Sequence, residues 1–247
     1  MNDRADGGEL EFRVAGELRF LLTPRFRDRE RPRVPYDRTS TLGHVVQSLG
    51  VPLTEVGGLT LDGEPVPPAH RPPGGGLVDV SAVPRPQALP ESPPRFLVDV
   101  HLGALARRLR LVGLDSAYSN NADDPALVAR SGAEHRVLLT QDRGLLRRRA
   151  LWLGAFVRGT RPDDQLTDVL ERFAPPLAPW TRCPACNGRL APVAKAEVAH
   201  RLEPGTLRTY DAFTRCRTCA RVYWRGAHGA RLEATVTAAE RALRHAD

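Results

Sequence analysis

The chain has 247 residues, which exceeds the usual size of one compact core, so two or three domains are expected. Hydrophobic residues make up 41% of the sequence, a share that excludes a largely disordered chain. No apolar run approaches membrane-spanning length, and the first residues, MNDRADGGELEF, are charged where a signal peptide would be apolar. We therefore expect a cytoplasmic protein with no membrane partner.

Positive charge is concentrated in the later part of the chain. The formal net charge is +7; residues 83–247 carry 26 basic and 17 acidic side chains, against 10 and 12 in residues 1–82. A positive field of this kind attracts polyanions, and nucleic acid is the commonest one in the cytoplasm. A solvated basic surface without a partner remains an open alternative.

Two proline-rich stretches divide the sequence. VPRPQALPESPPR covers residues 83–95, and APPLAP covers residues 174–179. Such segments resist helix and sheet formation and are typical of linkers. Three modules are therefore predicted, at residues 1–82, 96–174 and 180–235.

The first module is predicted to be a small β-sheet crossed by one helix. ELEFRVAGELRFLL alternates as strands do, TLGHVVQSLGV has helical spacing, and GLTLDGEPV and LVDVSAV predict further strands. This order resembles the β-grasp, ubiquitin-like fold, particularly its sulfur-carrier branch. Sulfur carriers end in a free Gly-Gly carboxylate, whereas here the last strand continues through Ala82 and Val83 into the linker. The resemblance therefore implies an adaptor or docking domain with a possible protein partner.

The second module alternates strand and helix. The predicted strands are FLVDV, AYS, RVLLT and AFVRG; the predicted helices are LGALARRLRLVG, DPALVARSG, RGLLRRRAL and DDQLTDVLERF. This alternation favours an α/β fold, a parallel sheet with flanking helices, in which ligands bind beyond the carboxyl ends of the strands. After Val236, the tail TAAERALRHAD is predicted to form a short, loosely attached helix.

Carboxylates gather where these strands end. Four acids lie at or just after the ends of three of the strands, and two more open the helix after the remaining strand: Asp99, Asp142, Asp163 and Asp164, with Asp123 and Asp124. Clustered carboxylates repel one another unless a hard divalent cation neutralises them, and Mg²⁺ or Mn²⁺ accepts these oxygen ligands. Such an ion can activate water against a phosphodiester.

Most of these acids also have a structural explanation. Asp124 precedes Pro125 and is placed to cap a helix, as are Asp163 and Asp164. Asp142 fits a turn. Asp99 is hardest to explain structurally, because it lies inside an apolar strand where an uncompensated charge is costly.

Arginines flank the acids. The apolar face of LGALARRLRLVG leaves Arg107, Arg108 and Arg110 largely on the other side, where they are candidates to hold phosphates. Arg143, Arg147, Arg148 and Arg149 form a second basic cluster after Asp142. For each arginine, a solvated surface charge is the alternative.

The residues quoted above resemble a known family. FLVDVHLGALARRLRLVGLD, DDPALVARSGAEHRVLLTQDRGLL and DDQLTDVLERF are similar to the Mut-seven C-terminal ribonuclease family, a PIN-like group, and the similarity continues through RCPACNGRL and FTRCRTCARVYWRGAH. The resemblance implies that Asp99, Asp124 and Asp142 match the family's acidic positions, with Asp164 as a fourth. PIN nucleases commonly have a glutamate at the second position, where this chain has aspartate. A ubiquitin-like domain in front, as in bacterial members, agrees with the first module.

The third module contains all four cysteines, in two Cys-x-x-Cys pairs separated by 29 residues: Cys183, Cys186, Cys216 and Cys219. Four thiolates at this spacing are typical of a structural, tetrahedral Zn²⁺ site, a zinc ribbon; redox use is the alternative. Tyr223, Trp224 and His228 follow among arginines, a mixture that suits base stacking or packing around the metal equally.

The leading hypothesis is a metal-dependent ribonuclease. A noncatalytic RNA-binding or ribosome-associated adaptor remains open because the acidic set is incomplete. A DNA nuclease remains open because no residue identifiably recognises a 2′-hydroxyl.

Overall fold

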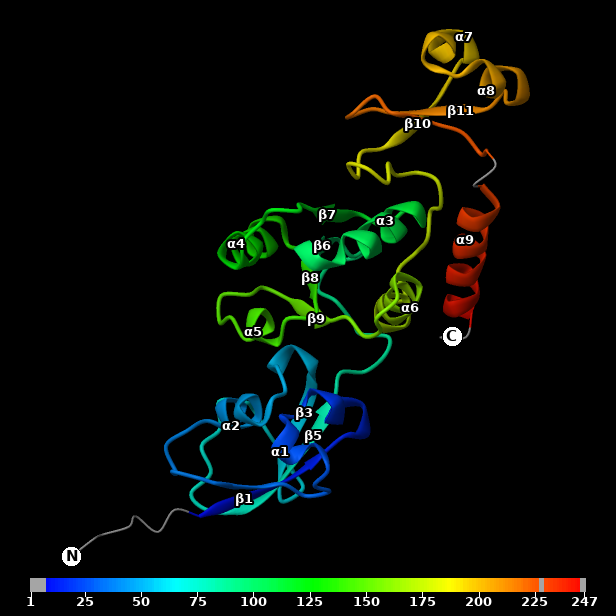
Figure 1. The fold of residues 1–247 in the computed structure, drawn as a ribbon. Coiled ribbons are helices and arrows are strands. Elements are labelled where there is room, and N and C mark those ends of the chain that lie inside the picture. The colour runs from blue at the N-terminus through cyan, green and yellow to red at the C-terminus, as the bar shows by residue number, and fades with distance from the viewer. Residues whose placement is uncertain (1–7, 227–228, 245–247) are drawn as a thin grey trace, which may run out of the picture. The chain divides into compact units, whose positions relative to one another are not determined.

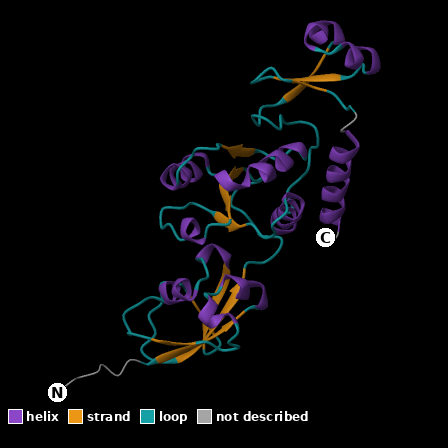
Figure 2. Cartoon of the chain, viewed as in Figure 1, coloured by secondary structure: helices purple, strands orange, loops and turns teal. Residues whose placement is uncertain are grey.

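The computed structural model describes residues 8–226 and 229–244 (Figures 1 and 2). The chain divides into two compact units: Met1–Pro84 with Asp142–Phe156, and Arg85–Gln141 with Val157–Asp247. The first unit thus takes in a segment from the middle of the sequence. None of the described helices combines the length and the apolar character that crossing a bilayer requires.

The first unit contains a five-stranded sheet in the order β2-β1-β5-β3-β4, in which β1 and β5 are parallel and the other neighbours antiparallel. The strands are β1 (Glu9–Val14), β2 (Arg33–Pro35), β3 (Val56–Leu61), β4 (Glu64–Val66) and β5 (Gly76–Ala82). This is the predicted β-grasp arrangement. The strand prediction fails only over Gly16–Leu21, which forms a 3-10 helix (η1) because its apolar residues Leu18 and Leu21 enter the core at helical spacing.

Helix α2 (Leu42–Leu49) crosses this sheet, as predicted. Its apolar side chains recur at helical spacing, and the Thr41 hydroxyl accepts the first free backbone N–H, that of His44, at 3.3 Å. The helix ends at Gly50, whose φ of +121° favours glycine. A Cβ at this position would also lie 2.8 Å from the backbone nitrogen of Thr23.

The segment Asp142–Phe156 contains the short helix α5 (Arg143–Leu146) and strand β9 (Gly154–Phe156). It is anchored in the first unit by Glu55, which is 1% exposed and accepts a 2.8 Å hydrogen bond from the backbone N–H of Phe156. Arg143 donates to the carbonyl of Leu21 at 2.7 Å, and the Phe156 ring lies 5.4 Å from that of Phe20. The anchor joins residues about a hundred positions apart in the sequence.

The second unit is built on the predicted parallel strands β6 (Phe96–Val98), β7 (Ser116–Tyr118) and β8 (Val137–Thr140), which lie in the order β7-β6-β8. β6 is parallel to both of its neighbours. Helices α3 (Gly103–Leu111), α4 (Asp124–Glu134) and α6 (Pro162–Phe173) flank the sheet (Figure 1), which explains why β6 and β8 are buried at every position and apolar except at Thr140. The chain passes from β6 to β7 and then back across to β8, so the strand order reverses between β6 and β8.

The C-terminal helix α9 (Gly229–Arg244) is longer and better packed than predicted. Val236 and Ala239 are 4% and 2% exposed, and the helix contacts α6 and α3. The prediction of a loosely attached tail was therefore wrong for the described residues. The predicted helix began after Val236, so the apolar face that Val236 and Ala239 share was not recognised.

A zinc-ribbon-like module completes the second unit. Its three antiparallel strands are β10 (Leu190–Val193), β11 (Phe213–Cys216) and β12 (Val222–Tyr223), with the short helices α7 (Lys195–Val198) and α8 (Pro204–Thr209) in the connection between β10 and β11. That connection accounts for most of the interval between the two cysteine pairs.

Candidate active site and metal centre

Asp99 lies at the carboxyl end of β6, next to the point where the strand order reverses. It is 5% exposed, and its Oδ2 accepts a 2.5 Å hydrogen bond from the hydroxyl of Thr140, the last residue of β8. Its backbone N–H also donates to Leu139 at 3.0 Å, and its Oδ1 lies 3.6 Å from Nδ1 of the exposed His101. Two neighbouring strands therefore fix this carboxylate where open α/β sheets bind ligands.

Asp124 is the first residue of α4 and is half-buried. The capping function expected of it belongs instead to Asp123, whose Oδ1 accepts a 2.9 Å hydrogen bond from the N–H of Ala126. Capping therefore accounts for Asp123, and Asp124 stays a predicted member of the acidic site.

Asp142 caps helix α5. Its Oδ1 accepts hydrogen bonds from the N–H groups of Gly144 at 2.6 Å and Leu145 at 3.4 Å, and the residue is exposed. Asp142 belongs to the first unit, whereas Asp99, Asp124 and Asp164 belong to the second.

Asp163 and Asp164 lie in the first turn of α6 but do not cap it, since Arg161 holds the N-cap position. Asp163 is paired with Arg108 of α3 through both carboxylate oxygens. Asp164 is paired with Arg161 by two hydrogen bonds of 3.0 Å, and this guanidinium lowers the pKa of Asp164 below its ordinary value.

The four arginines predicted to bind RNA have different surroundings. Arg107 is exposed on α3, whereas Arg108 is engaged by Asp163. In the first unit, Arg143 donates to a backbone carbonyl, and burial together with the charge of Arg143 lowers the pKa of Arg147.

The four cysteine sulfurs form one compact group. All four lie within 4.8 Å of one another; Cys183 and Cys219 are 3.7 Å apart, and Cys186 and Cys216 are 3.5 Å apart. A tetrahedral Zn²⁺ with Zn–S distances of about 2.3 Å separates its sulfurs by about 3.8 Å, so the residues fit zinc. Within residues 8–226 and 229–244, no other group of three or more His, Cys, Asp or Glu side chains brings its ligand atoms this close.

The two cysteine pairs are held by equivalent turns. In the first turn, the backbone N–H of Cys183 donates to the carbonyl of Gly188, and the Cys183 carbonyl accepts the N–H of Asn187. In the second turn, the N–H of Cys216 donates to the carbonyl of Arg221, and the Cys216 carbonyl accepts the N–H of Ala220. Asn187 and Ala220 both have positive φ, at +71° and +56°. Gly188 has no room for a side chain, because a Cβ there would lie 2.9 Å from the Cys216 sulfur.

Burial and backbone N–H groups act on the thiols in opposite directions. Burial raises the pKa of Cys186 to about 12, whereas at Cys216 the N–H groups of Cys219 and Thr218 outweigh burial and lower the pKa to about 7. Tyr223 donates or accepts a 3.0 Å hydrogen bond with the Cys183 sulfur, so it packs against the centre, while Trp224 is 41% exposed. His228 lies outside the described residues.

Two residues that the sequence did not single out for this purpose connect α3 and β7 to the zinc module. Arg110, expected on the outer face of α3, is 3% exposed and donates to the carbonyls of Pro184 and Ala185 at 3.0 Å each. Asp115 accepts hydrogen bonds from Asn187 at 2.8 Å and Arg182 at 3.1 Å. Their signal in the sequence is weak, because neither interrupts an apolar pattern.

Comparison with known proteins agrees with this architecture. Residues 94–236 match the model of the Mut7-C RNAse domain, and residues 7–88 match that of the Mut7-C ubiquitin domain. No curated protein and no solved structure matches the chain. The first match spans more than half of the chain and confirms the resemblance found in the residues. The protein therefore belongs to the Mut7-C RNAse domain family, with a Mut7-C ubiquitin domain preceding the RNAse domain.

Proposed function

We propose that the protein is a metal-dependent ribonuclease whose reaction centre lies at the carboxyl ends of β6 and β8. The observation that carries the proposal is Asp99: a carboxylate 5% exposed at the strand-order reversal, oriented by Thr140 from the neighbouring strand. Burying a carboxylate is costly unless it is neutralised, and a cation at this edge would provide that neutralisation. Membership of an RNAse family gives the reaction class.

Asp99 would be the principal metal ligand, with Asp124, Asp142 and Asp164 as the further acids implied by the sequence. Mg²⁺ commonly binds through one or two carboxylates and keeps several waters, so a closed protein cage is not required. The bound ion, Mg²⁺ or Mn²⁺, would lower the pKa of water and stabilise charge on the phosphodiester. Hydrolysis adds water to phosphorus, breaks the bond to the leaving ribose oxygen, and delivers a proton to that oxygen.

The cysteine centre has a different proposed role. Four sulfurs fill a tetrahedral zinc ion completely, so no position remains for water, and we assign the zinc to structure. The excess of basic side chains in residues 83–247 favours RNA as the partner.

We propose domains at residues 1–82, 96–174 and 180–235, with a linker at residues 83–95 and the protein in the cytoplasm. The ubiquitin domain would dock a protein partner.

A noncatalytic RNA-binding adaptor is the second candidate. Its support is that Asp163 and Asp164 are engaged by arginines and Asp142 by a helix N-terminus, so these carboxylates are already bound within the chain. An adaptor would bind RNA through the same surface without cutting it.

Cleavage assays separate the two candidates. Full-length protein and its Asp99→Asn variant are incubated with labelled single-stranded RNA, structured RNA and DNA, with Mg²⁺, with Mn²⁺ and without either ion. We expect ion-dependent RNA cleavage that Asp99→Asn reduces at least about a hundredfold. Salt-sensitive RNA binding without cleavage by either protein would establish the adaptor, and equal cleavage by both would show that Asp99 is not the centre.

A further inference from the structure

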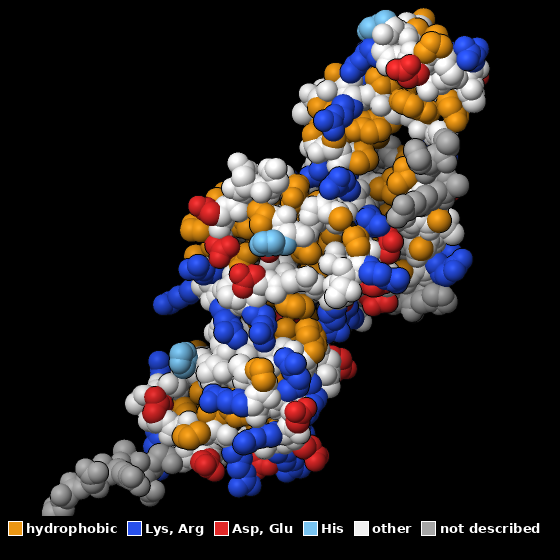
Figure 3. Space-filling model, viewed as in Figure 1, with side chains coloured by type: hydrophobic (Ala, Val, Ile, Leu, Met, Phe, Trp, Pro, Cys, Tyr) orange, Lys and Arg blue, Asp and Glu red, His pale blue; other side chains and the backbone are white. Residues whose placement is uncertain are grey.

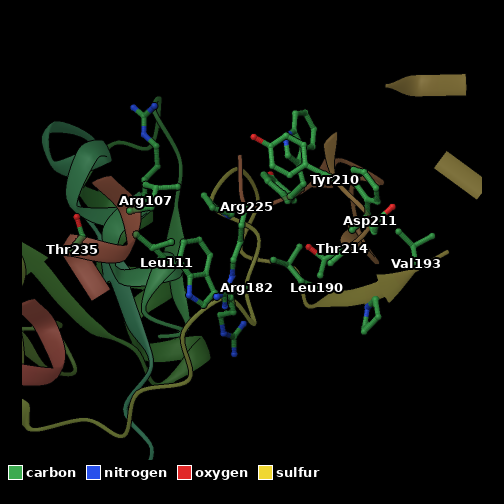
Figure 4. Close-up of a pocket in the computed structure, with 18 of the residues that line it drawn as sticks. Arg107, Leu111, Arg182, Leu190, Val193, Tyr210, Asp211, Thr214, Arg225 and Thr235 are labelled. Atoms are coloured by element: carbon green, nitrogen blue, oxygen red, sulfur yellow. The ribbon is translucent and has the colours of Figure 1, made fainter. Parts of the chain in front are cut away.

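A groove of about 1100 Å³ lies within the second unit. Helix α3 and helix α9 form one side of it, with Arg107, Leu111 and Thr235; the zinc module forms the other, with Tyr210 and Val193 (Figure 4). The close-up places Arg182 and Arg225 between the two sides. None of the four acids proposed for the reaction lines this groove.

Aromatic side chains are unusually dense along the groove. Of the seven tryptophan and tyrosine residues in the chain, four line it, together with one phenylalanine: Trp180, Trp224, Tyr210, Tyr223 and Phe213. Tyr223 is accounted for by its contact with the zinc centre, and Phe213 is buried. Trp224 is 41% exposed, which packing around the metal does not explain, since a packed tryptophan would be covered.

Positive charge is interleaved with these rings. Arg107 and Arg225 are exposed and form no ion pair with any residue in the described part of the chain, and the Arg225 guanidinium lies 4.9 Å from the Trp180 ring centre. The one carboxylate in the lining, Asp211, is neutralised by Lys195 at 2.7 Å. Figure 3 shows basic side chains beside hydrophobic ones on the upper part of the drawn face. The groove therefore presents apolar rings and uncompensated positive charge together.

We infer that this groove binds single-stranded RNA, with bases stacked on Trp224 and Tyr210 and phosphates held by Arg107 and Arg225. The inference deepens the proposed ribonuclease function and rests on it for the choice of RNA. Rings that stack bases beside arginines that contact the backbone are the means by which proteins bind single strands without sequence preference. A duplex buries the base faces that these rings would contact, so single strands should bind more tightly.

Fluorescence anisotropy of a short labelled oligouridine, in magnesium-free buffer with the zinc site loaded, measures binding without cleavage. Trp224→Ala should weaken binding about tenfold while leaving its salt dependence unchanged, and Trp224→Phe should recover most of the loss. Arg225→Gln should weaken binding and lower the salt dependence of the binding constant by about one phosphate contact. The blunt duplex of the same length should bind more weakly, and the matched deoxyribo-oligonucleotide measures any contribution of the 2′-hydroxyl.

Matched controls come from outside the groove. Phe20→Ala removes an aromatic side chain that is 40% exposed, and Arg208→Gln removes an exposed arginine on α8. Zinc content and melting temperature identify variants that fail to fold. Unchanged affinity in both Trp224→Ala and Arg225→Gln, or equal affinity for duplex and single strand, would overturn the inference.

The two proposals fail separately. RNA binding that depends on the groove, by a protein that does not cleave RNA, would exclude the ribonuclease proposal and support the groove as an RNA-binding site. Cleavage that depends on Asp99, together with RNA binding that substitution of Trp224 and Arg225 does not change, would support the ribonuclease and exclude the groove as the RNA site.

Discussion

Arg110 donates a 3.0 Å hydrogen bond to the backbone carbonyl of Pro184, inside the first Cys-x-x-Cys turn. The same guanidinium donates to the carbonyls of Ala185 and Ser116, so one side chain satisfies carbonyls in the zinc-ribbon-like module and at the first residue of β7. Burial lowers the pKa of Arg110, yet its three carbonyl partners favour the charged form. The zinc-ribbon-like module is thus attached to helix α3 and strand β7 by a buried cation.

Arg110→Met should destabilise the second unit by about 3 kcal/mol. Methionine preserves much of the apolar stem but leaves three carbonyls without a donor, and each buried unsatisfied group costs about 1–3 kcal/mol. Urea unfolding measures the change. Arg107→Met on the same helix is the control, since Arg107 is exposed and should change stability by less than about 0.5 kcal/mol. Equal effects of the two substitutions would contradict the attachment.

Asp115→Asn should remove stability in a pH-dependent way. Burial alone would raise the pKa of Asp115, but hydrogen bonds from Arg136 and Asn187 hold it below its ordinary value. A carboxyl with a lowered folded-state pKa stabilises the fold above its unfolded pKa of about 3.9, and this contribution disappears as the pH falls through the folded pKa.

Unfolding free energies measured from pH 8 to pH 3 test this expectation. The difference between wild type and Asp115→Asn should be constant down to about pH 5 and shrink below about pH 4, with a value near 3 kcal/mol at neutral pH. Acid-induced zinc loss affects both proteins, so their difference isolates the carboxyl. A difference that grows on acidification would mean that Asp115 has the opposite shift.

Removal of zinc should unfold the C-terminal module and loosen the helices attached to it. Structural zinc contributes on the order of 10 kcal/mol to the folding of small modules. Native mass spectrometry should find one zinc ion per chain, and chelation should lower the melting temperature, with recovery on adding Zn²⁺ but not Mg²⁺. A metal-free protein with four reactive thiols and an unchanged melting temperature would exclude a structural zinc centre.

Thr140→Val should slow RNA cleavage about tenfold without loss of fold. Valine has the shape of threonine but cannot donate to Asp99, and residues that orient a metal ligand commonly contribute tenfold to a hundredfold. The concentration of Mg²⁺ that gives half the maximal rate should rise, which a purely structural role would not produce. Thr60→Val is the matched control, because it removes a hydrogen bond from threonine to Asp79 in the first unit.

Glu55→Leu should release the segment Asp142–Phe156 from the first unit. The Glu55 carboxylate accepts the Phe156 N–H in a site where it is 1% exposed, so the substitution leaves that N–H without its partner and costs about 2 kcal/mol. Hydrogen exchange at the Phe156 amide should accelerate, and Glu55→Gln, which retains an acceptor, should have a smaller effect. Glu64→Leu, at an exposed position of β4, should leave the exchange rate unchanged.

Much of the fold could be predicted because it depends on local pattern. Apolar runs too short for helices predicted β6 and β8, and helical spacing after Thr41 predicted α2. The strand predicted from the alternation over Gly16 to Leu21 was wrong, since a 3-10 helix buries the same leucines. A local hydrophobic pattern predicts which residues are buried more reliably than it predicts whether they lie in a strand or a helix.

The candidate site was only partly predictable. Asp99 stood out because a charge inside an apolar strand is rare, whereas the pairing of Asp163 with Arg108 joins residues 55 positions apart and leaves no periodic trace. The burial of Arg110 was missed for a related reason. An arginine on a mixed helix face is ordinarily solvated, and only the carbonyls of Pro184 and Ala185 make its burial favourable.

The sequence alone indicated the family, the alternation of strands and helices in the second module and four cysteines that could hold a metal ion, because motif spacing and secondary structure are patterns of nearby residues. The tertiary structure decided which acids already have partners, that Asp142–Phe156 joins the first unit, and that aromatic and basic side chains from α3, α9 and the zinc module share one groove. These features require segments distant in the chain to pack together, and packing depends on the shape and polarity of both surfaces at once.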